Sequence, residues 1–318
     1  KDSKKGPAWS NSLFEDNAEF GYGMLLAQQA IRDGLKAKVE EVAANENATA
    51  EVKAACQEWL DTFGVGATNG AATDKLVAAL ENVDCPTCKD IVKNKAFLAK
   101  KSQWIFGGDG WAYDIGFNGV DHVLASGKDI NIMVFNTEVY SNTGGQSSKA
   151  TPTGAVAQFA AGGKEVKQKD LAAIAMSYGY VYVAQISMGA DMNQTIKAIA
   201  EAEAYPGPSL IIAYAPCINH GIKKGMAKAQ TEEKLAVQSG YWNLFRFNPA
   251  AEGKKFSLDC KPATVDYQEF IKGEVRYTSL ALKNPARAEK LFAKAEQNAK
   301  DKYAYLEKLV KLYDDNEQ

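Results

Sequence analysis

The stretch "WIFGGDGWAYDIG" at residues 104–116 decides how this chain is interpreted. The apolar run at 104–106 is typical of a short buried strand, and a helical pattern covers residues 113–126. Between them lies a turn in which Asp109 stands between two glycines. Because ligands of parallel sheets bind where strands end and helices begin, we expect this turn to hold a ligand. The candidates are a dinucleotide, a nucleoside triphosphate and another diphosphate bridged by a metal.

The alternation of strand and helix patterns continues along the chain. Apolar runs at 130–135, 180–186 and 209–214 are typical of buried strands. Helical patterns at 191–205 and in part of 154–178 separate them. This order predicts an α/β fold with a mostly parallel sheet covered by helices.

Changes in these patterns divide the chain into three parts. Residues 1–100 are expected to form a helical N-terminal part that packs on the core, and residues 101–231 the α/β core itself. Residues 232–318 show weaker patterns and are expected to form a C-terminal extension. That extension is expected to end in a long amphipathic helix from about residue 286 to residue 314.

Composition and charge argue against several classes of function. The 318 residues carry 37 basic and 39 acidic side chains, a net charge of -2, which disfavours a nucleic-acid-binding surface. No apolar run approaches the roughly 20 residues of a membrane span, and the start lacks the apolar region of a signal peptide. Five irregularly spaced cysteines indicate a reducing cytoplasm. A chain that begins at Lys1 without Met is expected to be a processed or excised piece.

The glycine-rich turn does not match the common nucleotide motifs. Gly108 and Gly110 fit the first two glycines of a dinucleotide fingerprint, but Tyr113 occupies the third position. Asn136 stands where an acidic ribose partner belongs, and no Gly-Lys-Ser/Thr follows as in a triphosphate-binding loop. Asp109 would repel a diphosphate unless a divalent cation lay between them. Mg²⁺ prefers hard oxygens, and the loop at 136–149, "NTEVYSNTGGQSSK", supplies many neutral ones.

These two loops together resemble the thiamine diphosphate motif. Gly108-Asp109-Gly110 is followed by 25 residues and then by Asn136. The usual motif ends in Asn-Asn, whereas this chain has Asn136-Thr137. The hydroxyl of Thr137 is an equally hard neutral oxygen, so the departure does not weaken the metal interpretation.

Longer stretches resemble the pyruvate:ferredoxin oxidoreductases. The similarity lies in "GGDGWAYDIGFNGVDHVLASG" (107–127), "NTEVYSNTGGQSSKATPTGA" (136–155), "APCINHGI" (215–222) and "WSNSLFEDNAEFG" (9–21). It covers roughly residues 1–250. The resemblance implies that the chain is the C-terminal, thiamine-diphosphate-binding part of such an enzyme, with helical additions.

The resemblance also assigns roles to individual residues. Side chains of Asp109 and Thr137 and the backbone carbonyl of Val139 are implied as Mg²⁺ ligands. Asn142 is implied to face the reacting carbon and is the candidate catalytic residue. The residues implied to bind the cofactor are Gly108, Asp109, Gly110, Trp111, Thr137, Glu138, Val139, Tyr140, Ser141 and Asn142.

Cys217 has two interpretations. A single Cys at a strand end is most often an inert small hydrophobic residue. In the family that this chain resembles, the Cys of "PCINHG" is implied as one thiolate of a [4Fe–4S] cluster. Such clusters need four thiolates, and no closely spaced run accompanies Cys217, so the others are expected on an upstream segment outside this chain.

Cys85-Pro-Thr-Cys88 and the two histidines are given no role by the resemblance. The C-x-x-C spacing is compatible with a zinc or iron site or with a redox dithiol. Neither His122 nor His220 stands beside a nucleophile elbow. His122 is expected to be structural, and His220 is expected either near the cluster or in an ordinary loop.

The implied activity is oxidative decarboxylation of pyruvate to acetyl-CoA and CO₂, with electrons passed to ferredoxin or flavodoxin. The implied cofactors are thiamine diphosphate, Mg²⁺ and the shared [4Fe–4S] cluster. The implied partners are coenzyme A, the pyrimidine-binding and ferredoxin-like parts of the same enzyme, and a second copy in a homodimer. No nucleic acid and no membrane is expected. Two alternatives remain: a non-redox thiamine-dependent 2-oxo acid decarboxylase or synthase, and a non-catalytic assembly subunit.

Overall fold

The computed structural model of the chain describes residues 8–314, which form two compact units. One unit holds the described residues up to Phe20 together with those from Trp104 onward. The other unit is Gly21–Gln103. The boundaries expected at residues 100 and 231 stay predictions.

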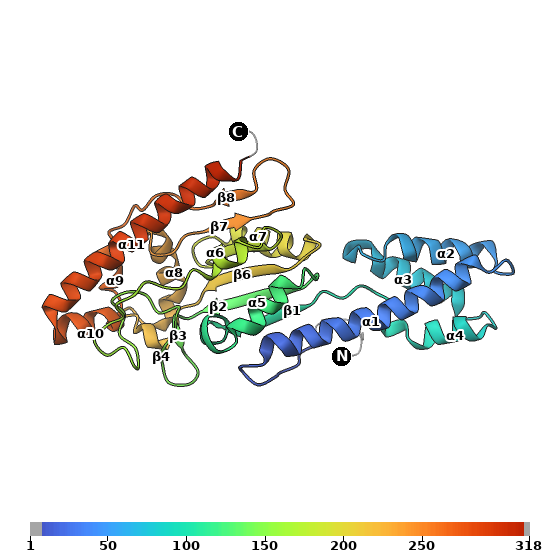
Figure 1. Ribbon diagram of the computed structural model, residues 1–318, viewed down its shortest axis with the longest axis horizontal. Helices are drawn as coiled ribbons and strands as arrows, with labels where there is room; N and C mark the ends of the chain where they lie inside the picture. The colour runs from blue at the N-terminus through green and yellow to red at the C-terminus, as the bar shows by residue number, and fades with distance from the viewer. Residues whose placement is uncertain (1–7, 315–318) are drawn as a thin grey trace. The chain divides into compact units, whose positions relative to one another are not determined.

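A six-stranded sheet forms the centre of the first unit, with helices packed against it (Figure 1). The strand order is β1-β2-β6-β5-β7-β8. The strands β1, β2, β6 and β5 pair in parallel. Strand β7 pairs antiparallel with β5, and β8 pairs antiparallel with β7. The predicted α/β fold with a mostly parallel sheet is confirmed. The strands are β1 (Trp104–Gly108), β2 (Asn131–Asn136), β5 (Tyr182–Ile186), β6 (Ser209–Tyr214), β7 (Phe245–Phe247) and β8 (Phe256–Leu258).

The strand register brings the polar loops together. Gly108 at the end of β1 pairs with Phe135 of β2, and Asn136 at the end of β2 pairs with Tyr214 of β6. Because the strands run parallel, the segments that follow all three leave the same edge of the sheet. The predicted site loops therefore lie at one edge.

Helix α7 (Met192–Ala204) shows how sequence and packing agree on one face of the sheet. Asp191 caps its N-terminus by accepting a hydrogen bond from the backbone N–H of Gln194. Ala198 and Ala202 are fully buried one turn apart and pack in a cluster with Ile211 of β6. Small side chains on the helix thus allow close contact with the branched side chains of the sheet.

The remaining helices of this unit follow the sheet in chain order. They are α5 (Phe117–Ala125), α6 (Leu171–Met176), α8 (Ala229–Gln238), α9 (Tyr267–Ile271), α10 (Val275–Lys283) and α11 (Pro285–Leu312). Helix α11 is the long helix expected near the C-terminus, and it packs against β8 (Figure 1). Asn284 caps it and Pro285 opens it, as is typical of helix starts. Shorter elements are a π-helix at Gly110–Ile115, 3-10 helices at Ile218–His220 and Met226–Lys228, and the hairpin of β3 (Val139–Tyr140) with β4 (Gln146–Ser147).

The second unit is helical and has its own core. It holds most of α1 (Asn17–Ala44), and Gln103 at its end donates a hydrogen bond to the carbonyl of Gly21 at its start, at 2.9 Å. Trp59 and Leu76 are fully buried in its core. Its other helices are α2 (Ala50–Asp61), α3 (Gly66–Leu80), α4 (Pro86–Lys93) and a 3-10 helix at Lys95–Phe97.

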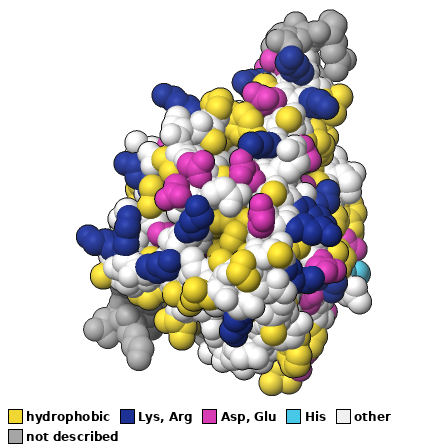
Figure 2. Space-filling view, turned by 90° about the vertical axis from the view of Figure 1, so that its left-hand side faces the viewer, with side chains coloured by type: hydrophobic (Ala, Val, Ile, Leu, Met, Phe, Trp, Pro, Cys, Tyr) yellow, Lys and Arg dark blue, Asp and Glu magenta, His cyan; other side chains and the backbone are white. Residues whose placement is uncertain are grey.

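The surface carries charges of both signs. On the face shown in Figure 2, basic and acidic side chains are interspersed among apolar ones. Within residues 8–314, no helix combines the length and the apolar sequence needed to cross a bilayer.

The core of the sheet gives a first prediction. Ile211 lies on the central strand β6 and is fully buried. Ile211→Ala should lower the free energy of unfolding by about 2–5 kcal/mol, because it removes buried methyl groups and leaves a cavity. Chemical denaturation measures this change. Ile196→Ala, at a position 58% exposed on α7, is the control and should change the free energy by less than about 0.5 kcal/mol.

Candidate cofactor and metal site

Asp109 ties the end of β1 to the loop after β2. Its carboxylate is fully buried. Oδ1 accepts hydrogen bonds from the backbone N–H of Thr137 at 3.0 Å and from the Thr137 hydroxyl at 2.8 Å. Oδ2 accepts a hydrogen bond from the Ser148 hydroxyl at 2.6 Å. The two predicted loops are thereby fastened to each other through one side chain.

The three predicted metal ligands lie in one cluster of oxygens. Thr137 Oγ1 is 2.8 Å from Asp109 Oδ1 and 3.0 Å from the carbonyl oxygen of Val139. The hydroxyl has a single proton, so it can donate to only one of these two acceptors at a time. The other contact then joins two oxygens with no proton between them. A cation would stabilise this arrangement, and the set of one carboxylate, one hydroxyl and one carbonyl fits Mg²⁺.

Electrostatics at Asp109 point the same way. Burial raises the pKa of its carboxyl group to about 6, although hydrogen bonds from Ser148 and Thr137 oppose the shift. A negative charge at this position is therefore costly unless a positive charge compensates it. Among the described residues, no group of three or more His, Cys, Asp and Glu is arranged to hold a metal. The Asp109 cluster contains one carboxylate and otherwise neutral oxygens, so it differs from a metal site built of several His, Cys, Asp or Glu side chains.

Close packing fixes the backbone around Asp109. A Cβ on Gly110 would come within 2.5 Å of the Tyr140 ring, so only glycine allows the hairpin to approach the turn here. A Cβ on Gly107 would lie 2.2 Å from the Trp111 ring. Trp111 is fully buried, and its indole N–H has no hydrogen-bond partner among the described residues. Sequence reasoning identified Gly110 but not Gly107.

The β3–β4 hairpin carries the remaining predicted cofactor residues. Val139 and Tyr140 form β3, and Gly145 donates a backbone hydrogen bond to Tyr140 at 2.9 Å, which closes the turn. Ser141 is partly exposed and Asn142 is exposed at the tip of this hairpin.

Cys217 lies at the same edge of the sheet, after β6. Its backbone N–H donates to Nδ1 of His220 at 3.0 Å, and Ala215 pairs with the carbonyl of Asn136 at 3.0 Å. The thiol is partly exposed. Burial raises its pKa, but hydrogen bonding and charge from His220 outweigh this, so the pKa lies below its usual value. A Cβ on Gly145 would lie 2.7 Å from the Asn219 side chain, so the hairpin and the Cys217 loop are in contact.

Comparisons with known proteins give a matching family and several relatives. Residues 92–213 match the family described as "Thiamine pyrophosphate enzyme, C-terminal TPP binding domain". The pyruvate:ferredoxin oxidoreductase of Moorella thermoacetica is 54% identical over 315 residues, covering 96% of this chain and 27% of that protein. The pyruvate-flavodoxin oxidoreductase of Klebsiella pneumoniae is 52% identical over 310 residues, covering 96% of this chain and 26% of its own length.

The chain matches a pyruvate:ferredoxin/flavodoxin oxidoreductase segment that contains the thiamine pyrophosphate-binding domain. It spans about a quarter of the length of these relatives. A further relative, the mitochondrial pyruvate dehydrogenase [NADP(+)] of Euglena gracilis, is 46% identical over 303 residues, covering 92% of this chain and 16% of that protein.

Within this chain, Glu138 turns away from the oxygen cluster. It has a φ of 63°, unusual for a residue with a side chain, and its carboxylate is fully buried. It forms an ion pair with Arg276 at 2.6 Å, accepts from the Tyr241 hydroxyl at 2.7 Å and lies 3.4 Å from Nε2 of His220. Burial raises the pKa of Glu138, but the charge of Arg276 and the contact with His220 lower it below its usual value. The side chain of Glu138 lies in this ionic network, and its expected contact with the cofactor stays a prediction.

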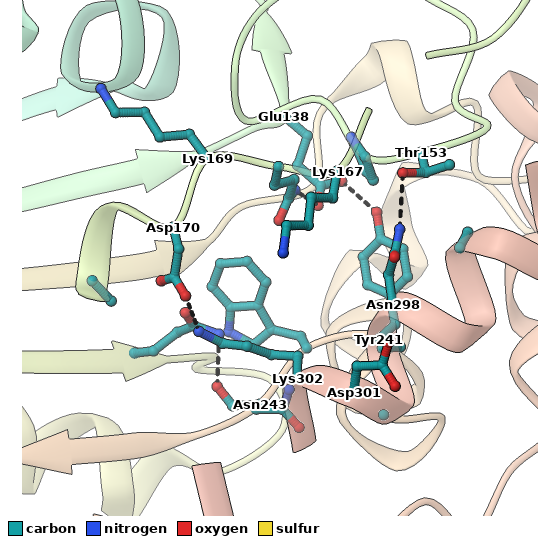
Figure 3. Close-up of a pocket in the computed structure, with 18 of the residues that line it drawn as sticks. Glu138, Thr153, Lys167, Lys169, Asp170, Tyr241, Asn243, Asn298, Asp301 and Lys302 are labelled. Atoms are coloured by element: carbon teal, nitrogen blue, oxygen red, sulfur yellow. Dashed lines mark hydrogen bonds and ion pairs between the residues drawn. The ribbon is translucent and has the colours of Figure 1, made fainter. Parts of the chain in front are cut away.

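A cavity of about 440 Å³ lies beside Glu138, which is one of its lining residues (Figure 3). Lys167 also lines the cavity, and Lys302 of α11 forms an ion pair with Asp170 at its wall. Asn298 donates a hydrogen bond to Thr153 at 3.2 Å across another wall. Loops, α11, the ends of α6 and α9 and residues of the central strands line this cavity, and sequence reasoning did not foresee it.

Several residues around the site carried no usable sequence signal. Ser148 lies inside the polar loop that was singled out, but one serine among several cannot be distinguished there. Arg276 and Tyr241 are far from Glu138 in the chain, so only folding brings them together. His220 was expected either near the [4Fe–4S] cluster or in an ordinary loop. In the structure it lies between Cys217 and Glu138. His122 is exposed on α5.

The buried ion pair gives a second prediction. Arg276→Met keeps the side-chain volume but leaves the buried carboxylates of Glu138 and Glu274 without the arginine that pairs with both. We expect the free energy of unfolding to fall by about 3–5 kcal/mol, as for other broken buried pairs. The comparison variant is Arg287→Met, whose exposed pair with Glu165 should contribute less than about 1 kcal/mol. Equal effects of the two variants in chemical denaturation would contradict this account.

Proposed function

We propose that this chain is the part of a pyruvate:ferredoxin or pyruvate:flavodoxin oxidoreductase that binds thiamine diphosphate with Mg²⁺. The observation that carries the proposal is the cluster of Asp109, Thr137 and the Val139 carbonyl at the edge where β1 and β2 end. Its oxygens are of the type that Mg²⁺ prefers, and a diphosphate supplies the oxygens that one carboxylate cannot. The family match and the relatives support the choice of cofactor.

The chain's own residues would divide the work of binding. Asp109 would compensate the charge of Mg²⁺, and Thr137 and Val139 would complete the protein ligands. Gly108 and Gly110 would let backbone N–H groups approach the diphosphate, beside Trp111. The turn and hairpin at 137–142 would wrap the rest of the cofactor, and Asn142 at its tip would face the reacting carbon.

When bound, thiamine diphosphate supplies a carbon nucleophile for the keto group of a 2-oxo acid and accepts the electrons released as CO₂ leaves. The role proposed for Asn142 is to donate a hydrogen bond at that position. Coenzyme A would take the acetyl group. The pyrimidine-binding part and the ferredoxin-like part of the enzyme would come from outside these residues, and the enzyme would act as a homodimer in the cytoplasm.

Cys217 is proposed to give one thiolate to a [4Fe–4S] cluster. Its partly exposed thiol at the cofactor edge and the lowered pKa both suit a thiolate ligand. Since a cluster needs four thiolates, three would come from another segment of the enzyme. The electrons would pass to ferredoxin or flavodoxin, the acceptors in the names of the Moorella and Klebsiella relatives.

Asp109→Asn tests the metal site. Loss of the one carboxylate in the cluster should weaken thiamine diphosphate and Mg²⁺ binding at least about tenfold, or about 1.4 kcal/mol, in titration calorimetry. Asn142→Ala is the comparison variant: it should lower kcat strongly while the dissociation constant of the cofactor changes little. Unchanged affinity in Asp109→Asn would show that the metal lies elsewhere, or that the chain is a non-catalytic assembly subunit.

Cys217→Ala separates the oxidoreductase from a non-redox thiamine enzyme. In the complete enzyme, this variant should lose iron–sulfur absorbance and reduce ferredoxin much more slowly, because an iron atom loses its thiolate. Binding of thiamine diphosphate should persist. Cys260→Ala is the control and should keep the full iron content. If Cys217→Ala retains its iron and its electron transfer, Cys217 is not a ligand.

A further inference from the structure

Cys85 and Cys88 lie together in the first turn of α4, in the helical unit. Cys85 is the N-cap residue, Pro86 opens the helix, and the Cys85 sulfur accepts a hydrogen bond from the backbone N–H of Cys88 at 3.4 Å. The helix N-terminus presents backbone N–H groups and a partial positive charge, both of which stabilise a thiolate. Cys85 has extended backbone angles, which carry its side chain back over the helix end. The two sulfurs are therefore close to each other and in different surroundings.

The two thiols differ in access and in acidity. Cys88 is 2% exposed and belongs to the hydrophobic core of the helical unit, whereas Cys85 is partly exposed at its edge. Hydrogen bonds from the Cys88 thiol and backbone lower the pKa of Cys85. Burial, together with the neighbouring Cys85, raises the pKa of Cys88 to about 12. Cys85 is thus the more accessible and more acidic thiol of the pair, which suits it to act as the nucleophile, and Cys88 keeps its proton at neutral pH.

A metal site is the other chemistry that this spacing allows. Zinc and iron–sulfur sites need about four donors, usually Cys or His. Cys56 is the cysteine near Cys88, but it is fully buried in the same core, and burial raises its pKa to about 11. Within residues 8–314, no third and fourth donor completes a set around this pair. The arrangement suits two thiols that react with each other.

We propose that Cys85 and Cys88 form a redox-active dithiol that exchanges with disulfide-bearing oxidants. The Cys85 thiolate attacks one sulfur of the oxidant, forms a mixed disulfide and releases the other sulfur as a thiolate. Cys88 then loses its proton and attacks the Cys85 sulfur, which closes an intrachain disulfide and releases the second thiol of the oxidant. The protein loses two electrons and two protons, and the oxidant is reduced to two thiols.

Closing this disulfide needs a small movement at the start of α4. Residues three apart in a helix have Cβ atoms about 5–6 Å apart, and a disulfide needs about 3.5–4.5 Å. Cys85 stands at the cap with extended backbone angles, and its carbonyl accepts the first helical hydrogen bond from Lys89 at 3.0 Å, so the movement has to preserve or replace this one bond. Pro86 has no N–H to lose at the first helical position. The site is independent of the cofactor proposal, since it lies in the unit with a separate core.

The test uses oxidised glutathione on the intact protein, followed by acid quenching, alkylation and mass spectrometry. Both cysteines lie between Lys75 and Lys89, so one tryptic peptide carries them, whereas Cys56 falls on the preceding peptide. We expect the peptide with Cys85 and Cys88 to lose the mass of two hydrogens and to recover it with dithiothreitol. In the reduced native protein, iodoacetamide should modify Cys85 at least about tenfold faster than Cys260, whose pKa is raised by burial.

Variants identify the order of the steps. Cys88→Ser should accumulate glutathione on Cys85, because the resolving thiol is absent, and Cys85→Ser should leave Cys88 unmodified. Cys260→Ser is the matched control and should behave like the parent protein. If Cys88→Ser fails to fold, the mass of the tryptic peptide from the parent protein still shows whether Cys85 and Cys88 form a disulfide. A peptide that stays reduced at every glutathione ratio, or a cross-link between the peptides of Cys56 and Cys88, would overturn the proposal.

Discussion

The hydrogen bonds of the Asp109 carboxylate are the constraint on which the candidate site depends. One oxygen holds the backbone and side chain of Thr137, and the other holds Ser148. The parallel strands β1 and β2 bring these groups to one edge, and this buried side chain holds the two loops at hydrogen-bonding distance. Gly107 and Gly110 are then required by packing, because the Trp111 and Tyr140 rings occupy the space where their Cβ atoms would be.

The turn at residues 137–139 joins two environments of opposite character. Thr137 and the Val139 carbonyl point toward the oxygen cluster, while Glu138 points into a buried network with Arg276 and Tyr241. The positive φ of Glu138 makes this reversal possible, at a conformational cost that the ion pair and its hydrogen bonds offset. His220 extends the network to the Cys217 loop. The oxygen cluster, the buried ions and the thiol thus share one short stretch of backbone.

Local sequence patterns predicted the features that local physics determines. The parallel strands are five or six residues long and apolar, so their runs were visible, and parallel pairing explains why Asp109 and Thr137 meet. The strands β7 and β8 have three residues each, too few to show an alternation. The partners of Glu138 were not predictable because they are remote in the chain and no spacing rule connects them. The ligand roles of Asp109, Thr137, Val139 and Cys217 stay proposals, although the structure gathers their atoms at one edge.

The chain enters and leaves the helical unit at neighbouring points, where the Gln103 side chain donates a hydrogen bond to the carbonyl of Gly21. A segment whose ends meet can be lengthened, shortened or exchanged in evolution without altering the strands on either side of it in sequence. Its core is made by its own side chains, so mutations there are not constrained by the geometry around Asp109. Selection can therefore adjust how the protein responds to its surroundings in this module while the chemistry encoded by the rest of the chain stays unchanged.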